Sequence, residues 1–408
     1  MATATVPAGD GFRIGMLLSD TRYRGITLQV IALFVLMLVF AWLVDNTVKN
    51  LAALGKDFSF GFLWQPSGYD INQHMIDYSS RSSNARAALV GILNTLLVAV
   101  LGCITATVLG VFAGVLRLSQ NWLIARLMTV YIETFRNVPV LIWILITAAV
   151  VNEFFPSPRE FRLDADGNAA ASPYLGGALV LTNRGIYAAA PVFHEGSGIV
   201  IWGLVAAIVI AILFGRWARR RQEETGEILP TGWIRSGIIL GIPLVLFFIA
   251  GMPISLEYPE LKGFNFQGGI YGRDSLIALW LALSVYTGAF IAESVRAGIL
   301  AVSKGQTEAA SALGLRPGRT MQLVILPQAL RVIIPPLISQ YLNLTKNSSL
   351  AIAVGYMDAT GTLGGITLNQ TGREMECILL LMAFYLVTSL VISMGMNWYN
   401  SRVKLKER

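Results

Sequence analysis

Long apolar stretches alternate with polar segments along the chain, and this pattern predicts helices that cross a membrane. The hydrocarbon core of a bilayer is about 30 Å thick, so a helix needs roughly 20 apolar residues to cross it. Eight stretches approach that length, and they are residues 26–44, 88–116, 124–151, 198–215, 234–252, 276–297, 332–356 and 376–398. The predicted fold class is therefore all-α, a polytopic membrane protein with about eight transmembrane helices.

The composition agrees with a membrane protein and excludes other classes. Of the 408 residues, 55% are hydrophobic and only 13% are charged, whereas soluble domains carry about 25% charged residues. This deficit of charge excludes a disordered chain and a typical cytosolic enzyme. Both cysteines lie in apolar stretches, and the two histidines lie far apart outside the spans, so the sequence predicts no disulfide framework and no metal site.

The distribution of charge over the loops predicts the orientation. If the N-terminus is inside and the eight spans alternate, the inner segments hold an excess of Lys and Arg, while the outer segments hold an excess of Asp and Glu. Cytoplasmic loops of membrane proteins show this basic excess. Both termini are therefore expected in the cytoplasm: residues 1–87 form a cytoplasmic segment, an anchor helix and an outer loop, and residues 400–408 form a basic tail. The net charge of +7 then reflects orientation and does not indicate nucleic acid.

Residues 298–331 interrupt the hydrophobic pattern on the predicted cytoplasmic side. Good helix formers occupy 307–313, Gly314 can end that helix in a left-handed conformation, and Pro317 suits the first turn of a second helix. Pro327 limits the second helix in turn. An exposed helical hairpin of this kind favours docking into a groove on another protein. A cytoplasmic connector without a partner is the alternative that the residues leave open.

The spacing within this segment resembles the EAA loop of ABC importer permeases. That family pattern is Glu-Ala-Ala, three residues, Gly, nine residues, an aliphatic residue, any residue, and Leu-Pro. The matching residues of this chain are Glu308, Ala309, Ala310, Gly314, Leu326 and Pro327. The resemblance implies that residues 303–329 form the coupling loop, which sits in a groove on a partner ATPase. Glu308, Ala310 and Gly314 are expected to bear that contact.

Further stretches resemble the polar amino-acid branch of the same family. Residues 131–139 are similar to its Tyr-x-Glu-x-Phe-Arg-Gly-Thr-Pro signature, with Asn137 and Val138 in place of Gly-Thr. Residues 292–299 and 346–350 also fit that branch. The overall length and the N-terminal extension look most like the long Q-type permeases of the general L-amino-acid importers.

The resemblance implies a division of the chain into core and insertion. Residues 88–151 and 276–399 are expected to form the two parts of a type I permease core. Residues 152–275 are expected to be an insertion that carries an extra helix pair and periplasmic loops. The sequence itself does not indicate what the insertion does.

The resemblance also implies partners and cofactors. An ABC ATPase homodimer would bind ATP and Mg, a periplasmic amino-acid-binding protein would deliver the L-amino acid, and a second homologous permease would complete a heterodimer in the lipid of the bacterial inner membrane. The sequence agrees that this chain is not the ATP-hydrolysing enzyme. No Lys is followed by Ser or Thr, so a P-loop of the form GxxxxGK[ST] is absent. No nucleic acid, metal or bound cofactor is expected on this chain.

Four charged residues fall at membrane depth, and they are Glu133, Arg136, Glu293 and Lys346. Ionisable groups inside a bilayer are costly, so they usually face a cavity or pair with one another. Glu133 and Arg136 share one helix face, as do Glu293 and Arg296. Each pair is interpreted either as part of a substrate path or as an internal ion pair.

Polar residues also interrupt the seventh span near its middle, and they include Asn343, Lys346, Asn347, Ser348 and Ser349. Such a run cannot face lipid and must face protein or a water-filled path. Interrupted helices expose backbone donors and acceptors, which suit a zwitterionic amino acid. These residues, together with Asn137, are therefore added to the candidate substrate path. A buried hydrogen-bonded cluster between helices is the alternative.

Two other functional classes are compatible with a polytopic chain. An ion-coupled secondary transporter of small polar solutes would use the interrupted seventh span, with Glu133 or Glu293 as an ion site. A membrane-embedded assembly or receptor protein would carry no substrate. The first would lose uptake when the ion gradient collapses, and the second would show no effect of substrate on a partner's ATPase rate. The secondary transporter leaves the EAA-like loop unexplained.

Overall fold

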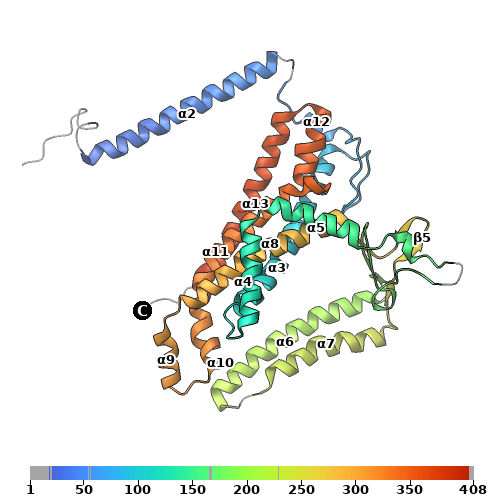
Figure 1. The fold of residues 1–408 in the computed structure, drawn as a ribbon, viewed down its shortest axis with the longest axis vertical. Coiled ribbons are helices and arrows are strands. Elements are labelled where there is room, and N and C mark those ends of the chain that lie inside the picture. Colours follow the sequence, from blue (N-terminus) through green and yellow to red (C-terminus); the bar gives the residue numbers. More distant parts are fainter. Residues whose placement is uncertain are drawn as a thin grey trace, which may run out of the picture.

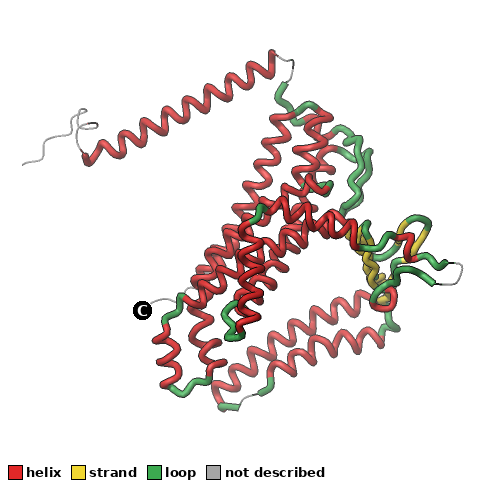
Figure 2. Tube along the Cα trace, in the orientation of Figure 1, coloured by secondary structure: helices red, strands yellow, loops and turns green. Residues whose placement is uncertain are grey.

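The computed structural model describes residue 18 and residues 21–53, 55, 57–164, 168–227 and 229–403. Long helices make up most of this part of the chain (Figures 1 and 2). They are α2 (Thr21–Ala53), α3 (Asn84–Leu116), α4 (Trp122–Asn137), α5 (Val140–Phe154), α6 (Ser197–Thr225), α7 (Thr231–Ile249), α8 (Asp274–Leu300), α11 (Leu326–Asn347) and α13 (Glu374–Val403). The shorter helices are α9 (Lys304–Ala312), α10 (Pro317–Thr320) and α12 (Leu368–Thr371).

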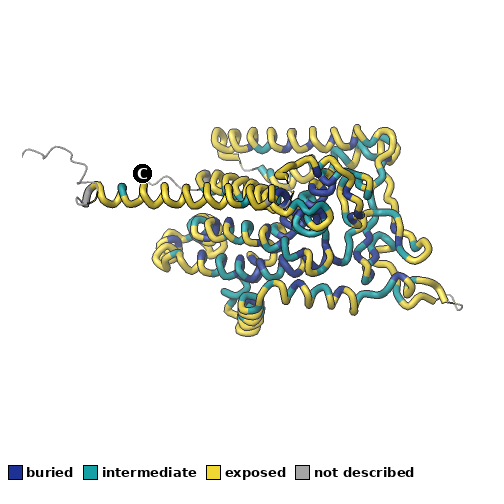
Figure 3. The backbone as a smooth tube through the Cα atoms, turned by 90° about the horizontal axis from the view of Figure 1, so that it is seen from above, coloured by how far each residue is buried: buried dark blue, intermediate teal, exposed yellow. Residues whose placement is uncertain are grey.

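Eight helical segments of the described chain are long and apolar enough to cross a membrane, which confirms the predicted polytopic, mainly helical fold. Helix α2 stands apart from the other helices, and its apolar side chains are exposed along its length (Figures 1 and 3). Lipid is the environment that suits such a helix. The predicted cytoplasmic segment before residue 18 and the end of the basic tail after residue 403 lie outside the described residues.

The core of the molecule forms where α3, α5, α8 and α11 pack together. Its buried side chains include Val98, Ile144, Leu279 and Leu344, one from each of these helices. Helix α8 is the central element, because 72% of its most apolar window is buried inside the chain. The buried residues therefore gather in the middle of the molecule and leave the outer helical faces exposed (Figure 3).

Two glycines allow α3 and α8 to approach closely. A Cβ atom built on Gly110 would lie 2.6 Å from the Ile291 side chain, and one on Gly114 would lie 2.5 Å from the Ala292 carbonyl oxygen. Real Cβ atoms do not come that near, so only glycine fits at either position. The small-residue pair thus brings two spans into contact, as such pairs do in other membrane proteins.

The third predicted span, residues 124–151, is two helices rather than one. Helix α4 ends at Asn137, Val138 has an extended backbone with φ −111° and ψ 135°, and α5 starts directly after Pro139. Proline cannot donate a backbone hydrogen bond and pushes the preceding residue out of the helical region. The prediction of one continuous helix was therefore wrong at this point, and the break places Asn137 at a corner between α4 and α5.

The α-helix of the seventh span ends inside the polar run, close to the interruption expected at Lys346–Ser349, but the backbone stays helical there because a 3-10 segment follows directly. Helix α10, a π segment (Met321–Ile325) and α11 follow one another with helical backbone angles throughout. The wider π turn accommodates Pro327 in the first turn of α11, so this proline does not limit a separate helix. The helix narrows to a 3-10 segment (Ser348–Val354) only after Asn347.

Residues 152–275 contain a helix pair, as expected, but also short strands that no sequence pattern indicated. Helices α6 and α7 are antiparallel neighbours that pack on each other. The strands β1 (Leu179–Thr182), β2 (Gly185–Ala188) and β7 (Ile270–Arg273) form one sheet, β3 (Ala190–Phe193) pairs with β4 (Ile254–Glu257), and β5 (Glu260–Lys262) pairs with β6 (Asn265–Gln267). Every pairing is antiparallel.

Tyr187 links the three-stranded sheet to the pair formed by β5 and β6. Tyr187 is almost completely buried, and its hydroxyl donates a hydrogen bond of 2.8 Å to the side-chain oxygen of Asn265. Burial raises the pKa of Tyr187 to about 12. The hydroxyl therefore stays protonated and keeps donating at every physiological pH.

Candidate functional site

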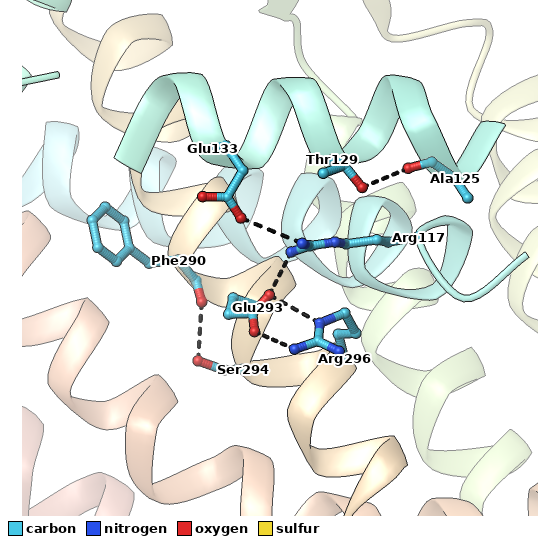
Figure 4. A network of polar contacts seen from close by, with 8 residues as sticks. All are labelled: Arg117, Ala125, Thr129, Glu133, Phe290, Glu293, Ser294 and Arg296. Carbon is cyan, nitrogen blue, oxygen red and sulfur yellow. Dashed lines mark hydrogen bonds and ion pairs between the residues drawn. The ribbon is translucent and has the colours of Figure 1, made fainter. Parts of the chain in front are cut away.

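An ionic network joins α3, α4 and α8 close to the end of α8 (Figure 4). Arg117, at the C-terminus of α3, lies 2.6 Å from Glu293 on α8 and 3.3 Å from Glu133 on α4. Arg296 donates two further hydrogen bonds to Glu293, of 3.0 and 2.5 Å. Glu293 thus receives two guanidinium groups, while Glu133 receives one weaker contact on the more exposed side.

One of the two expected ion pairs forms in the structure, and the other does not. Glu293 and Arg296 pair as their spacing indicated. Glu133, by contrast, pairs with Arg117, and the guanidinium of Arg136 lies over the Phe290 ring at 5.4 Å. Among the described residues, no partner accepts a hydrogen bond from the buried Nε of Arg136. Arg136 is therefore a cation without a neutralising carboxylate in direct contact among the described residues.

The polar residues of the seventh span divide between two faces of α11. Asn343 and Lys346 are exposed and Asn347 is half-buried, and their spacing places all three on one helix face. Ser348 points the other way: it is completely buried, and its hydroxyl donates to the carbonyl oxygen of Thr345 at 2.7 Å. Ser349 is half-buried. The run therefore has a buried serine on one side and a partly exposed polar face on the other.

We call Asn343, Lys346 and Asn347 the polar stripe of α11. Lipid cannot satisfy an ammonium and two amides at this depth, so a water-filled path or another protein must cover them. Between described residues, no hydrogen bond or ion pair joins the polar stripe to the network around Glu293. The two groups of candidate substrate-path residues are thus separate within this chain.

The helical hairpin that follows α8 has the turn that its glycine indicated. Only 301–303 separate α8 from α9, and α9 ends where Gly314 takes a left-handed backbone with φ +76°. The N–H of Gly314 donates to Ser311 and the N–H of Leu315 donates to Ala310, at 2.9 and 3.1 Å. This pair of bonds is the Schellman arrangement, which closes the end of a helix and usually requires glycine.

The surface of the hairpin differs in part from the expectation. Glu308, Ala309 and Gly314 are exposed, but Ala310 is only 4% exposed and packs inside the hairpin. Ala310 therefore has no surface to offer a partner, because the hairpin itself covers it. Leu313, which the motif did not single out, is 82% exposed. A large apolar side chain that stands free on a polar hairpin marks an interaction surface.

The remaining motif residues lie where the second arm of the hairpin continues into α11. Leu326 and Pro327 are both exposed there. The side chain of Gln328 donates a hydrogen bond of 3.3 Å to Gln306, which ties this arm to α9. The hairpin is thus braced against the start of the seventh span, and a force on α9 reaches both α8 and α11.

Comparison with known proteins supplies the family. Residues 106–405 match the model of the binding-protein-dependent transport system inner membrane component. The chain belongs to this permease family. Over their full lengths, it is 54% identical to the glutamate/glutamine/aspartate/asparagine transport system permease protein BztB of Rhodobacter capsulatus. It is also 45% identical to the general L-amino acid transport system permease protein AapQ of Rhizobium johnstonii, over all of this chain and 99% of that protein.

A third relative extends the same group. The putative amino-acid ABC transporter permease protein YhdX of Escherichia coli is 45% identical over 93% of this chain and 94% of its own. The resemblance to ABC importer permeases drawn from the hairpin and the core motifs is therefore confirmed, and so is the type I permease fold. The permease family consists of transport subunits, which agrees with the expectation that this chain is not an enzyme.

Sequence reasoning missed Arg117, although this residue holds the network of the permease together. It is the only charged residue of the short loop 117–123, and that position was the one available signal. Its partners lie 16 and 176 residues further along the chain. Such a contact depends on how α3, α4 and α8 pack, which no local pattern shows.

Asn94 and Thr95 of α3 bind the segment that follows the 3-10 helix Ser348–Val354. The amide of Asn94 donates to the carbonyl oxygen of Met357 at 2.8 Å, and the N–H of Ala359 donates to the Thr95 hydroxyl at 3.0 Å. These bonds fix the end of the seventh span against α3. The polar stripe of α11 therefore sits on a segment anchored at both ends.

Proposed function

We propose that this permease carries L-amino acids of several side-chain types across the bacterial inner membrane by alternating access, driven by a separate ABC ATPase. The observation that carries the proposal is the exposed hairpin of α9, which follows the central span directly and is braced against the next one. It offers a docking surface for a protein that supplies energy. The amino-acid substrates follow from the names of the full-length relatives.

In this proposal the polar stripe of α11 lines the path of the substrate. The chain leaves Asn343 and Lys346 exposed and Asn347 half-buried, and a second, homologous permease would enclose them on the other side. A periplasmic binding protein would deliver the amino acid to the outer loops. ATP and Mg would be held by the ATPase homodimer, on whose closure the hairpin moves and reorients α8 and α11.

The energy source distinguishes this proposal from an ion-coupled transporter. We expect uptake by proteoliposomes that contain the permease and its accompanying proteins to require ATP. The ATP must be on the side of the membrane that the hairpin faces. Uptake should persist when an ionophore collapses the proton and sodium gradients. Uptake that stops with the gradients and continues without ATP would establish the ion-coupled alternative and overturn the proposal.

Asn347 provides a test of the substrate path. An Asn347→Asp variant adds a negative charge to the polar stripe, so we expect uptake of arginine to rise relative to uptake of glutamate by roughly tenfold, the effect of about 1.4 kcal/mol. The measurement is competitive uptake of the two labelled amino acids. Asn369→Asp is the control, because this exposed asparagine lies outside the stripe. An unchanged preference in the Asn347 variant would remove the stripe from the substrate path.

A further inference from the structure

The helix pair of the insertion stands beside the core rather than within it. Among the described elements, α6 and α7 pack chiefly on each other (Figure 1). The residues of α6 that face α7 are mostly small. A Cβ atom built on Gly203, for example, would lie 2.1 Å from the Leu246 side chain. The outward faces are apolar and exposed, as Trp202, Leu213 and Leu244 illustrate. Lipid therefore surrounds most of this pair, which we call the insertion hairpin.

The length of α6 sets where the bilayer ends. From Ser197 to Gly215 the helix rises about 28 Å, close to the thickness of the hydrocarbon core. Arg235 on α7 lies against this end point, since a Cβ atom on Gly215 would be 3.5 Å from its guanidinium. Helix α6 continues for ten more residues, to Thr225. The segment directly after Gly215 is thus at the level of lipid headgroups.

Three arginines share one face of α6 at that level. Arg216, Arg219 and Arg220 have the i, i+3, i+4 spacing that places side chains together. All three are exposed, and none forms an ion pair with a described residue. Ala218 is buried and points to the opposite side of the helix. The arginine face is therefore directed away from the packed side of the hairpin.

Among the described residues, the other charged groups at this end form no ion pair with that face. Arg221 points elsewhere: it contacts the Trp217 ring at 5.4 Å and pairs with Glu227 at 3.0 Å. Glu223 and Glu224 follow Arg219 and Arg220 by one helical turn, further from the bilayer, and both are exposed without an ion pair to them. Two tryptophans flank the arginines, Trp217 on α6 and the 85% exposed Trp233 on α7. Tryptophan concentrates at the boundary between headgroups and acyl chains.

We propose that the insertion hairpin binds the phosphate groups of anionic phospholipids through Arg216, Arg219 and Arg220. Guanidinium groups bind phosphate oxygens in a bidentate manner, and three of them converge at headgroup depth on a helix whose apolar faces already contact acyl chains. Juxtamembrane basic clusters attract anionic lipid in the same way. Bound lipid headgroups would then hold the insertion hairpin in place beside the permease core, in addition to its limited contact with that core.

Native mass spectrometry of the full chain, purified in mild detergent with the proteins that accompany it, tests the proposal. Phosphatidylglycerol and cardiolipin should stay bound, whereas phosphatidylcholine should not. Each arginine contributes about a factor of five, so the variant Arg216→Gln/Arg219→Gln/Arg220→Gln should lose about a hundredfold in affinity for the anionic lipids. The variant with lysine at all three positions keeps the charge and should retain most of the binding.

The matched control removes three basic side chains elsewhere. Arg81, Arg159 and Lys262 are exposed residues of the loops at the other end of the spans, and their replacement by glutamine should leave lipid binding unchanged. Equal loss in both triple variants would overturn the proposal, as would displacement of the lipid by millimolar inorganic phosphate. If the triple glutamine variant does not fold, the three single variants replace it, each with an expected loss of about fivefold.

Discussion

Replacing Gly314 by aspartate should lower amino-acid uptake strongly while the protein still folds and enters the membrane. Gly314 is exposed, and no atom lies within 4 Å of the position that a new Cβ would take, so the change creates no clash. It does place a side chain on a residue with φ +76°, which costs about 1 kcal/mol, and a negative charge on the docking face of the hairpin. We expect uptake to fall about tenfold or more, since each 1.4 kcal/mol lost at the interface is a factor of ten.

The readout is the coupling between two rates. In reconstituted complexes, substrate-loaded binding protein should no longer raise the ATPase rate of the Gly314→Asp variant, although nucleotide hydrolysis itself continues. Gly314→Asn keeps the shape without the charge and separates the backbone effect. Gly318→Asp adds the same charge at an open position of α10 where the backbone is not left-handed, and it should have the smaller effect. Normal uptake by Gly314→Asp would remove the hairpin from the coupling role.

Local signals were enough to predict the spans and the hairpin. Each span is an apolar run of bilayer length, which depends on neighbouring residues alone. The end of α9 at Gly314 and the start of α10 at Pro317 follow from the backbone preferences of those two residues, and both are found in the structure. The Glu308 motif adds its spacing to these preferences, so the hairpin could be recognised without any knowledge of packing.

Features that depend on distant partners were not predictable. The strand β2 pairs with β7, more than eighty residues later, and both are four residues long. Strands of this length show too little alternation to stand out from a loop. The burial of Ala310 and the bridge formed by Arg117 likewise arise only when helices pack. The break at Val138 is different, because Pro139 signalled it and the long apolar run concealed it.

The second large effect concerns the centre of the ionic network. A Glu293→Gln variant keeps the size of the side chain but removes the one carboxylate that Arg117 and Arg296 share. Two partly buried guanidinium groups then face each other, and the unpaired Arg136 lies near them. Removing one partner from a buried ion pair costs 3–5 kcal/mol, and a quarter of the Glu293 side chain is exposed, so we expect a loss of about 2 kcal/mol in the free energy of unfolding.

Glu133→Gln is the matched control for this loss, because it makes the same substitution in the same network. Its side chain is 50% exposed and its single contact with Arg117 is 3.3 Å long, so we expect less than about 1 kcal/mol. Unfolding in mixed micelles of increasing SDS content, followed by circular dichroism, measures both. If the two variants are equally stable, Glu293 is not what holds α3 to α8. If Glu293→Gln alone is destabilised, the network fixes the C-terminal end of α8, and only residues 301–303 separate that fixed end from α9.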